Sequence, residues 1–148
     1  RDARSAAQMK LVVDASVALK WFIGWRANGQ FVDEAQAIAA HLSDARLELF
    51  APSHWIAEVA AVLARSEPRM CADAIGMLYD IRPRIVDSAH VLRRAADLAV
   101  ELEHHLFDTL YHAVAIECDA TLVTADDRYS AKASPHGHII RLMDFRPD

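Results

Sequence analysis

The chain has 148 residues, of which 53% are apolar and 25% are charged, and its formal net charge is −5 at pH 7. This composition is typical of a globular protein, and a domain of this length can fold without disulfide bonds. No apolar run is long enough to span a bilayer, which excludes a membrane-spanning protein, and the negative charge does not by itself indicate a nucleic-acid-binding protein.

The start of the chain and its cysteines limit what else it contains. Met9 and Lys10 introduce a strand pattern, whereas residues 1–8 have no regular pattern. We therefore expect a single domain over residues 9–146, preceded by leader or added residues. Cys71 and Cys118 lie in different helical patterns and form neither a zinc-binding spacing nor a CxxC redox motif. Free thiols and the lack of a signal peptide predict a cytoplasmic protein.

Strand patterns and helix patterns alternate along the chain. The first half predicts a buried strand over residues 10–14, helices over 15–23 and 31–46, a strand over 47–52 and a helix over 52–66 that Pro52 opens. The second half predicts a helix over 68–81, a strand over 84–87, helices over 88–103 and 107–119, a strand over 120–126, a loop or short helix over 127–134 and a strand over 138–145. This alternation favours an α/β fold with a mainly parallel sheet.

The residue pattern also predicts which helix faces are buried. Ser88 is expected to cap the helix over 88–103, and the inner face of that helix is predicted to hold Leu92, Ala95, Ala99 and Leu102. In the helix over 52–66, Glu58 lies off the apolar stripe, beside the core rather than in its centre.

Four carboxylates stand at the edge of apolar segments or inside them: Asp14, Glu58, Asp108 and Asp126. Burying an unpaired carboxylate costs several kcal/mol, and two like charges ~4 Å apart cost about 4 kcal/mol at an effective dielectric of about 20. Ligands of parallel α/β sheets bind at the carboxyl ends of the strands, where we expect Asp14 and Asp126. A hard divalent cation, Mg²⁺ or Mn²⁺ rather than Zn²⁺, would relieve this repulsion.

Four segments carry a family resemblance: MKLVVDASVALKWF, PSHWIAEVAAVL, HHLFDTLYHAVAIECDATLVTADDRY and HIIRLMDF. In this order and spacing they resemble the PIN-domain ribonucleases, and more narrowly the VapC type of toxin in prokaryotic toxin–antitoxin pairs. The resemblance covers residues 9–146 and implies a three-layer α/β/α fold with strand order 3-2-1-4-5. It also implies that Mg²⁺ or Mn²⁺ is bound by Asp14, Glu58, Asp108 and Asp126.

The function implied is metal-dependent endoribonuclease activity that hydrolyses RNA phosphodiester bonds. Asp14 and Asp108 are expected to be the central metal ligands, and Glu58 and Asp126 to complete the site directly or through water. Two hydroxyl residues, Ser16 and Thr124, stand where the family usually has small hydroxyl residues near the metal, and we expect them to hydrogen-bond the ligands.

The resemblance further implies the partners of the protein. They are an RNA substrate, a cognate antitoxin of the VapB type that obstructs the acidic cleft, and a second copy in a homodimer. Promoter DNA would be contacted only through the antitoxin. The sequence does not identify the RNA, the antitoxin or the number of metal ions.

Other functions place an acid after the first strand. An aspartyl phosphatase needs a second acid two residues after Asp14, where this chain has Ser16. The alternative kept open is a receiver-like signalling module that binds Mg²⁺ without nuclease activity, although such a module needs paired acids there and a lysine near the last strand, where this chain has Arg141. A PIN domain that has lost its activity is disfavoured by the four intact acids.

Two histidines lie one helical turn from predicted ligands. His54 precedes Glu58 and His112 follows Asp108, each by four residues. We expect both to be surface residues or to support the ligands by hydrogen bonds rather than to bind metal. Asp127, next to Asp126, is expected to be a loop or cap residue.

Overall fold

Five parallel strands form a sheet in this computed structural model, which describes residues 8–24 and 29–146. The strands are β1 (Met9–Val13), β2 (Leu47–Pro52), β3 (Arg84–Val86), β4 (Thr121–Thr124) and β5 (Ile139–Arg141). They lie in the order β3-β2-β1-β4-β5, and each neighbouring pair is parallel. The predicted α/β fold and its strand order are therefore confirmed. Residues 1–7, most of the expected leader segment, lie outside the described residues.

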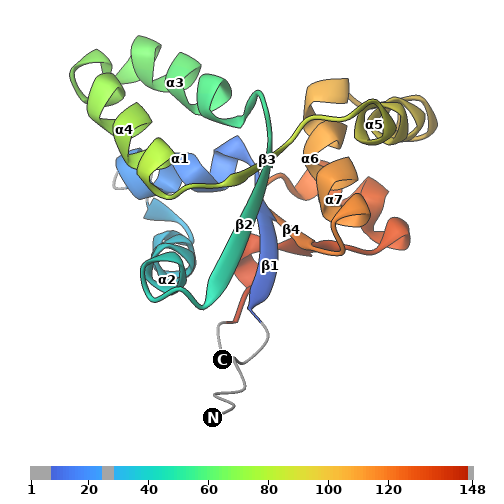
Figure 1. The fold of residues 1–148 in the computed structure, drawn as a ribbon, viewed down its shortest axis with the longest axis horizontal. Helices are drawn as coiled ribbons and strands as arrows, with labels where there is room; N and C mark the ends of the chain where they lie inside the picture. Colours follow the sequence, from blue (N-terminus) through green and yellow to red (C-terminus); the bar gives the residue numbers. More distant parts are fainter. Residues whose placement is uncertain (1–7, 25–28, 147–148) are drawn as a thin grey trace.

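Helices cover the sheet in two groups that Figure 1 shows on its left and right. The left group contains α1 (Ala15–Ile23), α2 (Val32–Ser43), α3 (Trp55–Ser66) and α4 (Pro68–Asp80). The right group contains α5 (Ala89–Leu102), α6 (Leu106–Glu117) and α7 (Asp127–Ala133). This arrangement confirms the three-layer α/β/α architecture, with the strands between the two groups.

Side-chain caps fix where three of the helices begin. Ser88 caps α5 as predicted, since its hydroxyl accepts a hydrogen bond from the Val91 amide. Asp14 and Asp126 cap α1 and α7 in the same way. A cap contributes about 0.5–2 kcal/mol, so two of the four predicted metal ligands also define helix starts.

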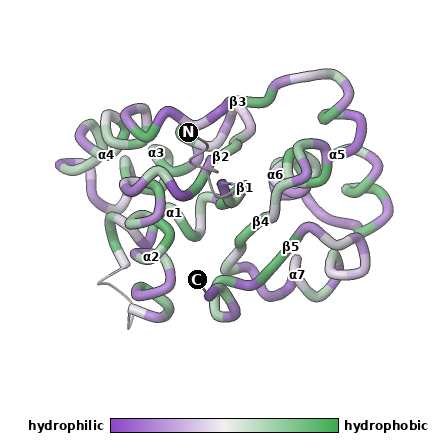
Figure 2. The backbone as a smooth tube through the Cα atoms, turned by 60° about the horizontal axis from the view of Figure 1, so that its bottom comes forward, coloured by the Kyte–Doolittle hydropathy of each residue, from purple (hydrophilic) through white to green (hydrophobic). Residues whose placement is uncertain are grey.

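The core lies along the central strands. Leu11, Val12 and Val13 of β1 and Leu122 and Val123 of β4 are at most 2% exposed. Figure 2 shows the apolar residues of β4 and β5 running through the middle of the molecule, while hydrophilic residues are frequent on the outer helices. Strands buried on both faces explain why these segments are continuously apolar rather than alternating.

Two element boundaries differ from the sequence prediction. Pro52 does not open a helix but ends β2, where it pairs with Val86, and α3 begins at Trp55. The last strand stops at Arg141 rather than at residue 145, and a short 3₁₀ helix follows over Leu142–Asp144. β5 pairs with β4 alone and ends level with Thr124, because β4 has no residues beyond that point to pair with.

The buried face of α5 also differs. Val91, Ala95 and Leu98 are buried, whereas Leu92, which was predicted to face inward, is 49% exposed. Both sets have helical spacing and share Ala95, so periodicity alone cannot choose between them. Tertiary packing makes the choice, since α5 packs against α6, and the Thr109 hydroxyl of α6 donates to the Ala95 carbonyl at 2.8 Å.

No helix in the described part of the chain is both long and apolar enough to cross a membrane.

His112 lies in the interior, so the prediction of a surface position is wrong. Its exposed fraction is 0%, because nearly the whole circumference of α6 is buried. The ring donates from Nε2 to the Gly137 carbonyl at 2.8 Å, and Nδ1 accepts from the Tyr129 hydroxyl at 2.8 Å. Burial lowers the pKa of His112, so the neutral ring links α6 to α7 and to the loop before β5.

We predict that His112→Leu lowers the free energy of unfolding by about 2–4 kcal/mol, because each buried polar group left unpaired costs about 1–3 kcal/mol. The groups left unpaired are the Tyr129 hydroxyl and the Gly137 carbonyl. Urea denaturation measures the loss. The control is His90→Leu at a side chain that is 72% exposed, for which the change should stay below about 1 kcal/mol. Equal losses in both variants would contradict a structural role for His112.

Candidate functional site

Asp14 is held at the carboxyl end of β1 by four hydrogen bonds, each with a different residue. Its Oδ1 accepts from the Ser16 hydroxyl at 2.5 Å and from the Val17 amide at 3.2 Å. Its Oδ2 accepts from the Thr124 hydroxyl of β4, and its own amide donates to the Val123 carbonyl at 3.4 Å. Both carboxylate oxygens are therefore fixed in direction by the ends of two neighbouring strands.

The electrostatic environment of Asp14 is unfavourable for a negative charge. The pKa of Asp14 is raised from 3.8 to about 6, mainly by burial and to a smaller extent by the nearby Asp126. The hydrogen bonds from Ser16, Thr124 and Val17 act in the opposite direction but do not cancel the burial. A positive charge nearby would favour the ionised form of this carboxylate.

Asp126 lies on the same edge of the sheet. Its amide donates to the Thr124 hydroxyl oxygen at 3.0 Å, and its Oδ1 accepts from the Tyr129 amide at 3.1 Å as the cap of α7. The Ser16 hydroxyl accepts from the Ala125 amide at 3.4 Å. The two predicted hydroxyl residues thus connect the loop after β4 to Asp14, which is the supporting geometry expected of them.

Asp108 approaches these two acids from α6. It lies in the first turn of that helix, near the positive end of the helix dipole, and its side chain is 43% exposed. A small cavity of about 20 Å³ is lined by Asp14, Asp108 and Asp126 together with Thr124 and Tyr111, among others. The structure therefore brings three of the four predicted acids to one cavity.

Glu58 stands beside this cavity rather than in its lining. Its Oε1 accepts from the hydroxyl of Tyr111, which does line the cavity, at 3.1 Å. Its Oε2 lies 3.5 Å from His54 Nε2. Partial burial is the main cause that raises the pKa of Glu58, and the charge of Asp108 adds to it. Glu58 is thus connected to the other acids through Tyr111.

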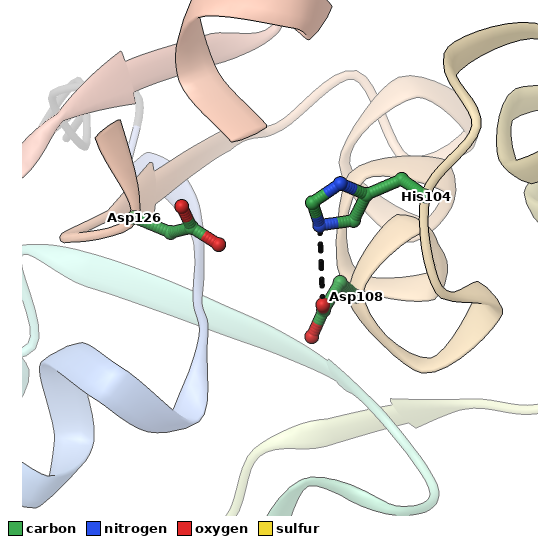
Figure 3. Close-up of side chains that lie close together, drawn as sticks. All are labelled: His104, Asp108 and Asp126. Atoms are coloured by element: carbon green, nitrogen blue, oxygen red, sulfur yellow. Dashed lines mark ion pairs between the residues drawn. The ribbon is translucent and has the colours of Figure 1, made fainter. Parts of the chain in front are cut away.

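One residue of the site has no counterpart in the sequence prediction. His104 lies in the turn between α5 and α6, and its Nε2 is 3.2 Å from Asp108 Oδ2. His104, Asp108 and Asp126 each offer one ligand atom within 4.8 Å of the others, and Figure 3 shows Asp126 directed toward the other two. The available signal was the four-residue spacing between His104 and Asp108.

The remaining candidates lie outside this group. His54 donates from Nε2 to the Phe107 carbonyl at 2.9 Å, so that nitrogen carries a proton. Asp127 is exposed in the first turn of α7, as expected for a residue that does not replace Asp126.

A larger groove opens next to the small cavity and shares two of its acids. It has a volume of about 600 Å³ and is lined by His104, Asp108, Asp126, Arg128 and Lys132, among others. Acidic and basic side chains therefore face each other across one concave surface. Such a surface suits a ligand that carries phosphate and is bridged to carboxylates by a cation.

The residues present fit a hard divalent cation. Three carboxylates line one cavity, and two of them, Asp108 and Asp126, offer ligand atoms within 4.8 Å of each other. The pKa of Asp14 is raised by burial, and His104 Nε2 is a buried atom without a hydrogen-bond partner in the described structure. Carboxylate oxygens are the ligands that Mg²⁺ and Mn²⁺ take. In the site as described, Asp14, Asp108 and Asp126 would hold the ion.

We predict that Asp14 destabilises the metal-free fold at neutral pH. A pKa of about 6 in the folded protein against 3.8 corresponds to roughly 3 kcal/mol once the carboxyl is ionised in both states. Below a pH of about 4 the carboxyl is protonated in both states and this cost is absent. The cost grows as the pH rises and is complete above about 6.

Asp14→Asn should therefore be more stable than the wild type by up to about 3 kcal/mol at neutral pH, with a difference that shrinks toward pH ~4. The Ser16 and Thr124 hydroxyls can rotate to accept from the new amide. Urea unfolding in the presence of a chelator measures both proteins across this pH range, and Asp127→Asn is the exposed control. A difference that does not change with pH would refute the stated cause.

The chain matches one family model, described as PIN domain, over residues 11–135. No match is found among curated protein sequences. Solved structures with a similar fold include PAE2754 from Pyrobaculum aerophilum, which is 16% identical with a TM-score of 0.60, covering 91% of this chain and 90% of that one.

Two further structures are complexes. A toxin–antitoxin complex from Klebsiella pneumoniae is 16% identical with a TM-score of 0.62, covering 89% of this chain and 97% of that one. VapBC2 from Rickettsia felis, bound to a DNA fragment from its promoter, is 18% identical with a TM-score of 0.63, covering 90% and 98%. At these identities the likeness shows the fold alone, whereas the family model covers most of the sequence. The chain belongs to the PIN-domain family.

Proposed function

We propose that this protein is a metal-dependent endoribonuclease and the toxin of a VapBC-type toxin–antitoxin pair. The observation that carries the proposal is the meeting of Asp14, Asp108 and Asp126 in one cavity, from three different elements. Membership of the PIN family supports a nuclease, and the fold is shared with a toxin–antitoxin complex and with VapBC2.

The proposed ion is Mg²⁺ or Mn²⁺, held by the three cavity acids. When bound, it supplies positive charge that polarises a phosphate oxygen and favours ionisation of an attacking water. Asp14 is the most rigid ligand, because Ser16 and Thr124 hold both of its oxygens. Asp108 is 43% exposed and lines the groove, so it is placed to meet the substrate side of the ion.

Glu58 is proposed to complete the site from its edge. Burial and the neighbouring Glu58 raise the pKa of Tyr111. Its hydroxyl therefore stays protonated and donates a hydrogen bond to Glu58 Oε1. Rotation away from Tyr111 would turn the Glu58 carboxylate toward the cavity, where it can accept a proton from water. Its raised pKa suits that exchange, since a base works best when its pKa lies near the operating pH.

The groove is the proposed path of the RNA backbone. Arg128 and Lys132 of α7 line the groove together with Asp108 and Asp126. Phosphates bound near the two cations would place a neighbouring phosphodiester at the acids. A groove of about 600 Å³ has room for unstacked nucleotides, which is the form in which proteins usually recognise RNA sequence.

The proposed protein partner is an antitoxin of the VapB type, and this proposal rests on the structural neighbours. A second groove of about 440 Å³, lined by Trp21, Phe22, Leu42 and Ile81 among others, lies between α1, α2 and α4 and offers an apolar surface to such a partner. Promoter DNA would be bound through the antitoxin, and the toxin is proposed to form homodimers. Co-expression with the reading frame next to this gene tests the pairing by rescue of cell growth.

The receiver-like alternative predicts a different reaction. A receiver takes a phosphoryl group onto an aspartate carboxylate, whereas the proposed nuclease hydrolyses a phosphodiester with water. Incubation with a small phosphodonor separates the two functions, because a receiver becomes covalently phosphorylated and a nuclease does not.

We predict that Asp108→Asn lowers RNA cleavage by about 100-fold or more, since a cation in a nuclease site contributes several kcal/mol to transition-state stabilisation. The fold should be little affected, with a change in the free energy of unfolding of at most about 1 kcal/mol, because the Asp108 carboxylate is 43% exposed. Cleavage of labelled RNA with and without excess chelator gives the measurement.

The matched control is Asp127→Asn, which removes an exposed carboxylate from the first turn of α7 next to Asp126. It should retain most of the wild-type rate. Cleavage that persists in Asp108→Asn, or that excess chelator leaves unchanged, would overturn the proposed function.

A further inference from the structure

His104 belongs to the same group of side chains as two of the proposed ligands. Asp108 follows it by four residues, and Asp126 comes from the start of α7. His104 Nε2 lies 3.2 Å from Asp108 Oδ2, and Figure 3 shows the ring and both carboxylates around one space. Neighbouring atoms that bind one ion at about 2.1 Å are separated by about this distance.

The Nε2 atom of His104 is also unsatisfied. The side chain is 12% exposed, but Nε2 itself is buried and has no hydrogen-bond partner within the described part of the chain. Its contact with Asp108 is close without being aligned as a hydrogen bond. Buried polar atoms are nearly always paired, and leaving one unpaired costs about 1–3 kcal/mol. A cation between His104 and the two carboxylates would supply the missing partner.

The contrast with His54 shows why only one of the two histidines fits this role. Both precede an acid by four residues, and both rings pack against a tyrosine, His54 on Tyr111 at 4.7 Å and His104 on Tyr129 at 4.8 Å. His54 Nε2, however, donates to the Phe107 carbonyl at 2.9 Å. A nitrogen that donates a hydrogen bond to a carbonyl cannot bind a cation at the same time, whereas His104 Nε2 makes no hydrogen bond in the described part of the chain.

From this geometry, and resting on the proposed function, we infer that His104 supplies an imidazole nitrogen to the cation held by Asp108 and Asp126. Imidazole suits first-row transition metals, while Mg²⁺ prefers oxygen ligands. His104 therefore makes the site selective for Mn²⁺ over Mg²⁺.

Lys132 opposes this ligation and offers an internal test. Its Nζ lies 3.4 Å from His104 Nδ1 and donates to the Glu103 carbonyl at 3.2 Å. An ammonium beside Nδ1 favours the ring form that carries its proton on Nε2. Binding through Nε2 requires the form with the proton on Nδ1. Removing the ammonium should therefore strengthen metal binding in two ways. It takes away a nearby positive charge, and it favours the ring form of His104 that can bind through Nε2.

The test is electron spin-echo spectroscopy of Mn²⁺ bound to the full chain, which detects a directly bound ¹⁴N nucleus. The wild type should show the nitrogen coupling, and His104→Phe, which keeps an aromatic ring against Tyr129, should lose it. His104→Gln is the second variant if the first does not fold. His105→Gln, at the exposed neighbour in the same turn, should retain the coupling.

Binding titrations give a second readout. The dissociation constant for Mn²⁺ should rise about 10-fold or more in His104→Phe, while that for Mg²⁺ changes by less than about 2-fold. Lys132→Met should tighten Mn²⁺ binding more strongly in the wild-type background than in the His104→Phe background. Equal tightening in both backgrounds would show a charge effect alone and would contradict ligation by His104.

The outcomes separate this inference from the proposed function. If Mn²⁺ binds without nitrogen coupling while RNA cleavage with Mg²⁺ persists, His104 is not a ligand and the nuclease proposal stands. If the coupling is present in the wild type and lost in His104→Phe but no divalent ion supports cleavage, the metal site stands and the nuclease proposal falls.

Discussion

The burial of one carboxylate, Asp14, at the end of the central strand is the constraint on which the site depends. As the cap of α1, Asp14 contributes about 0.5–2 kcal/mol. Its raised pKa shows that ionisation in the folded protein costs more than that. A serine or asparagine would cap the helix without this cost. The stability of the metal-free fold therefore does not explain the acid, which supports the proposal that Asp14 binds a cation.

The hydrogen bonds around Asp14 make the site rigid before any ligand arrives. Ser16 comes from the first turn of α1 and Thr124 from the end of β4, and both donate to the same carboxylate. Thr124 also accepts from the Asp126 amide. The spacing between Asp14 and Asp126 is thus fixed by neighbouring strand ends, which are among the least mobile parts of an α/β sheet. A site on such elements needs little reorganisation to bind an ion.

The sequence predicts those parts of the fold that local patterns determine. β1 and β4 are recognisable because both faces are buried, and Asp14 and Asp126 are recognisable because they follow such strands directly. The face of α5 was not predictable, because two apolar stripes share Ala95 and the choice depends on how α5 packs against α6. The end of β5 was not predictable either, since it is set by the length of β4 and not by its own residues.

The same limit applies to the candidate site. Sequence reasoning expected Glu58, like Asp126, to complete the site directly or through water. The Glu58 carboxylate accepts a hydrogen bond from Tyr111, and that contact joins residues 53 positions apart. The sequence prediction did not include His104 among the site residues, because His104 precedes α6 and its sequence position is typical of a turn. A histidine four residues before an acid can also donate to a backbone carbonyl, as His54 does to that of Phe107. Tertiary contacts determine whether this happens.

These two histidines also define the direction from which a substrate can approach. On the Glu58 side, His54 packs against both Phe107 and Tyr111. His54 also donates to the Phe107 carbonyl and Tyr111 donates to the acid, so this side is held by contacts within the protein. On the Asp108 side, the acid is more exposed and faces the groove. The groove on the α6–α7 side is lined by acidic and basic side chains together, among them Asp108, Asp126, Arg128 and Lys132. The proposed substrate, a phosphodiester that needs both a cation and basic side chains, would therefore approach from this side.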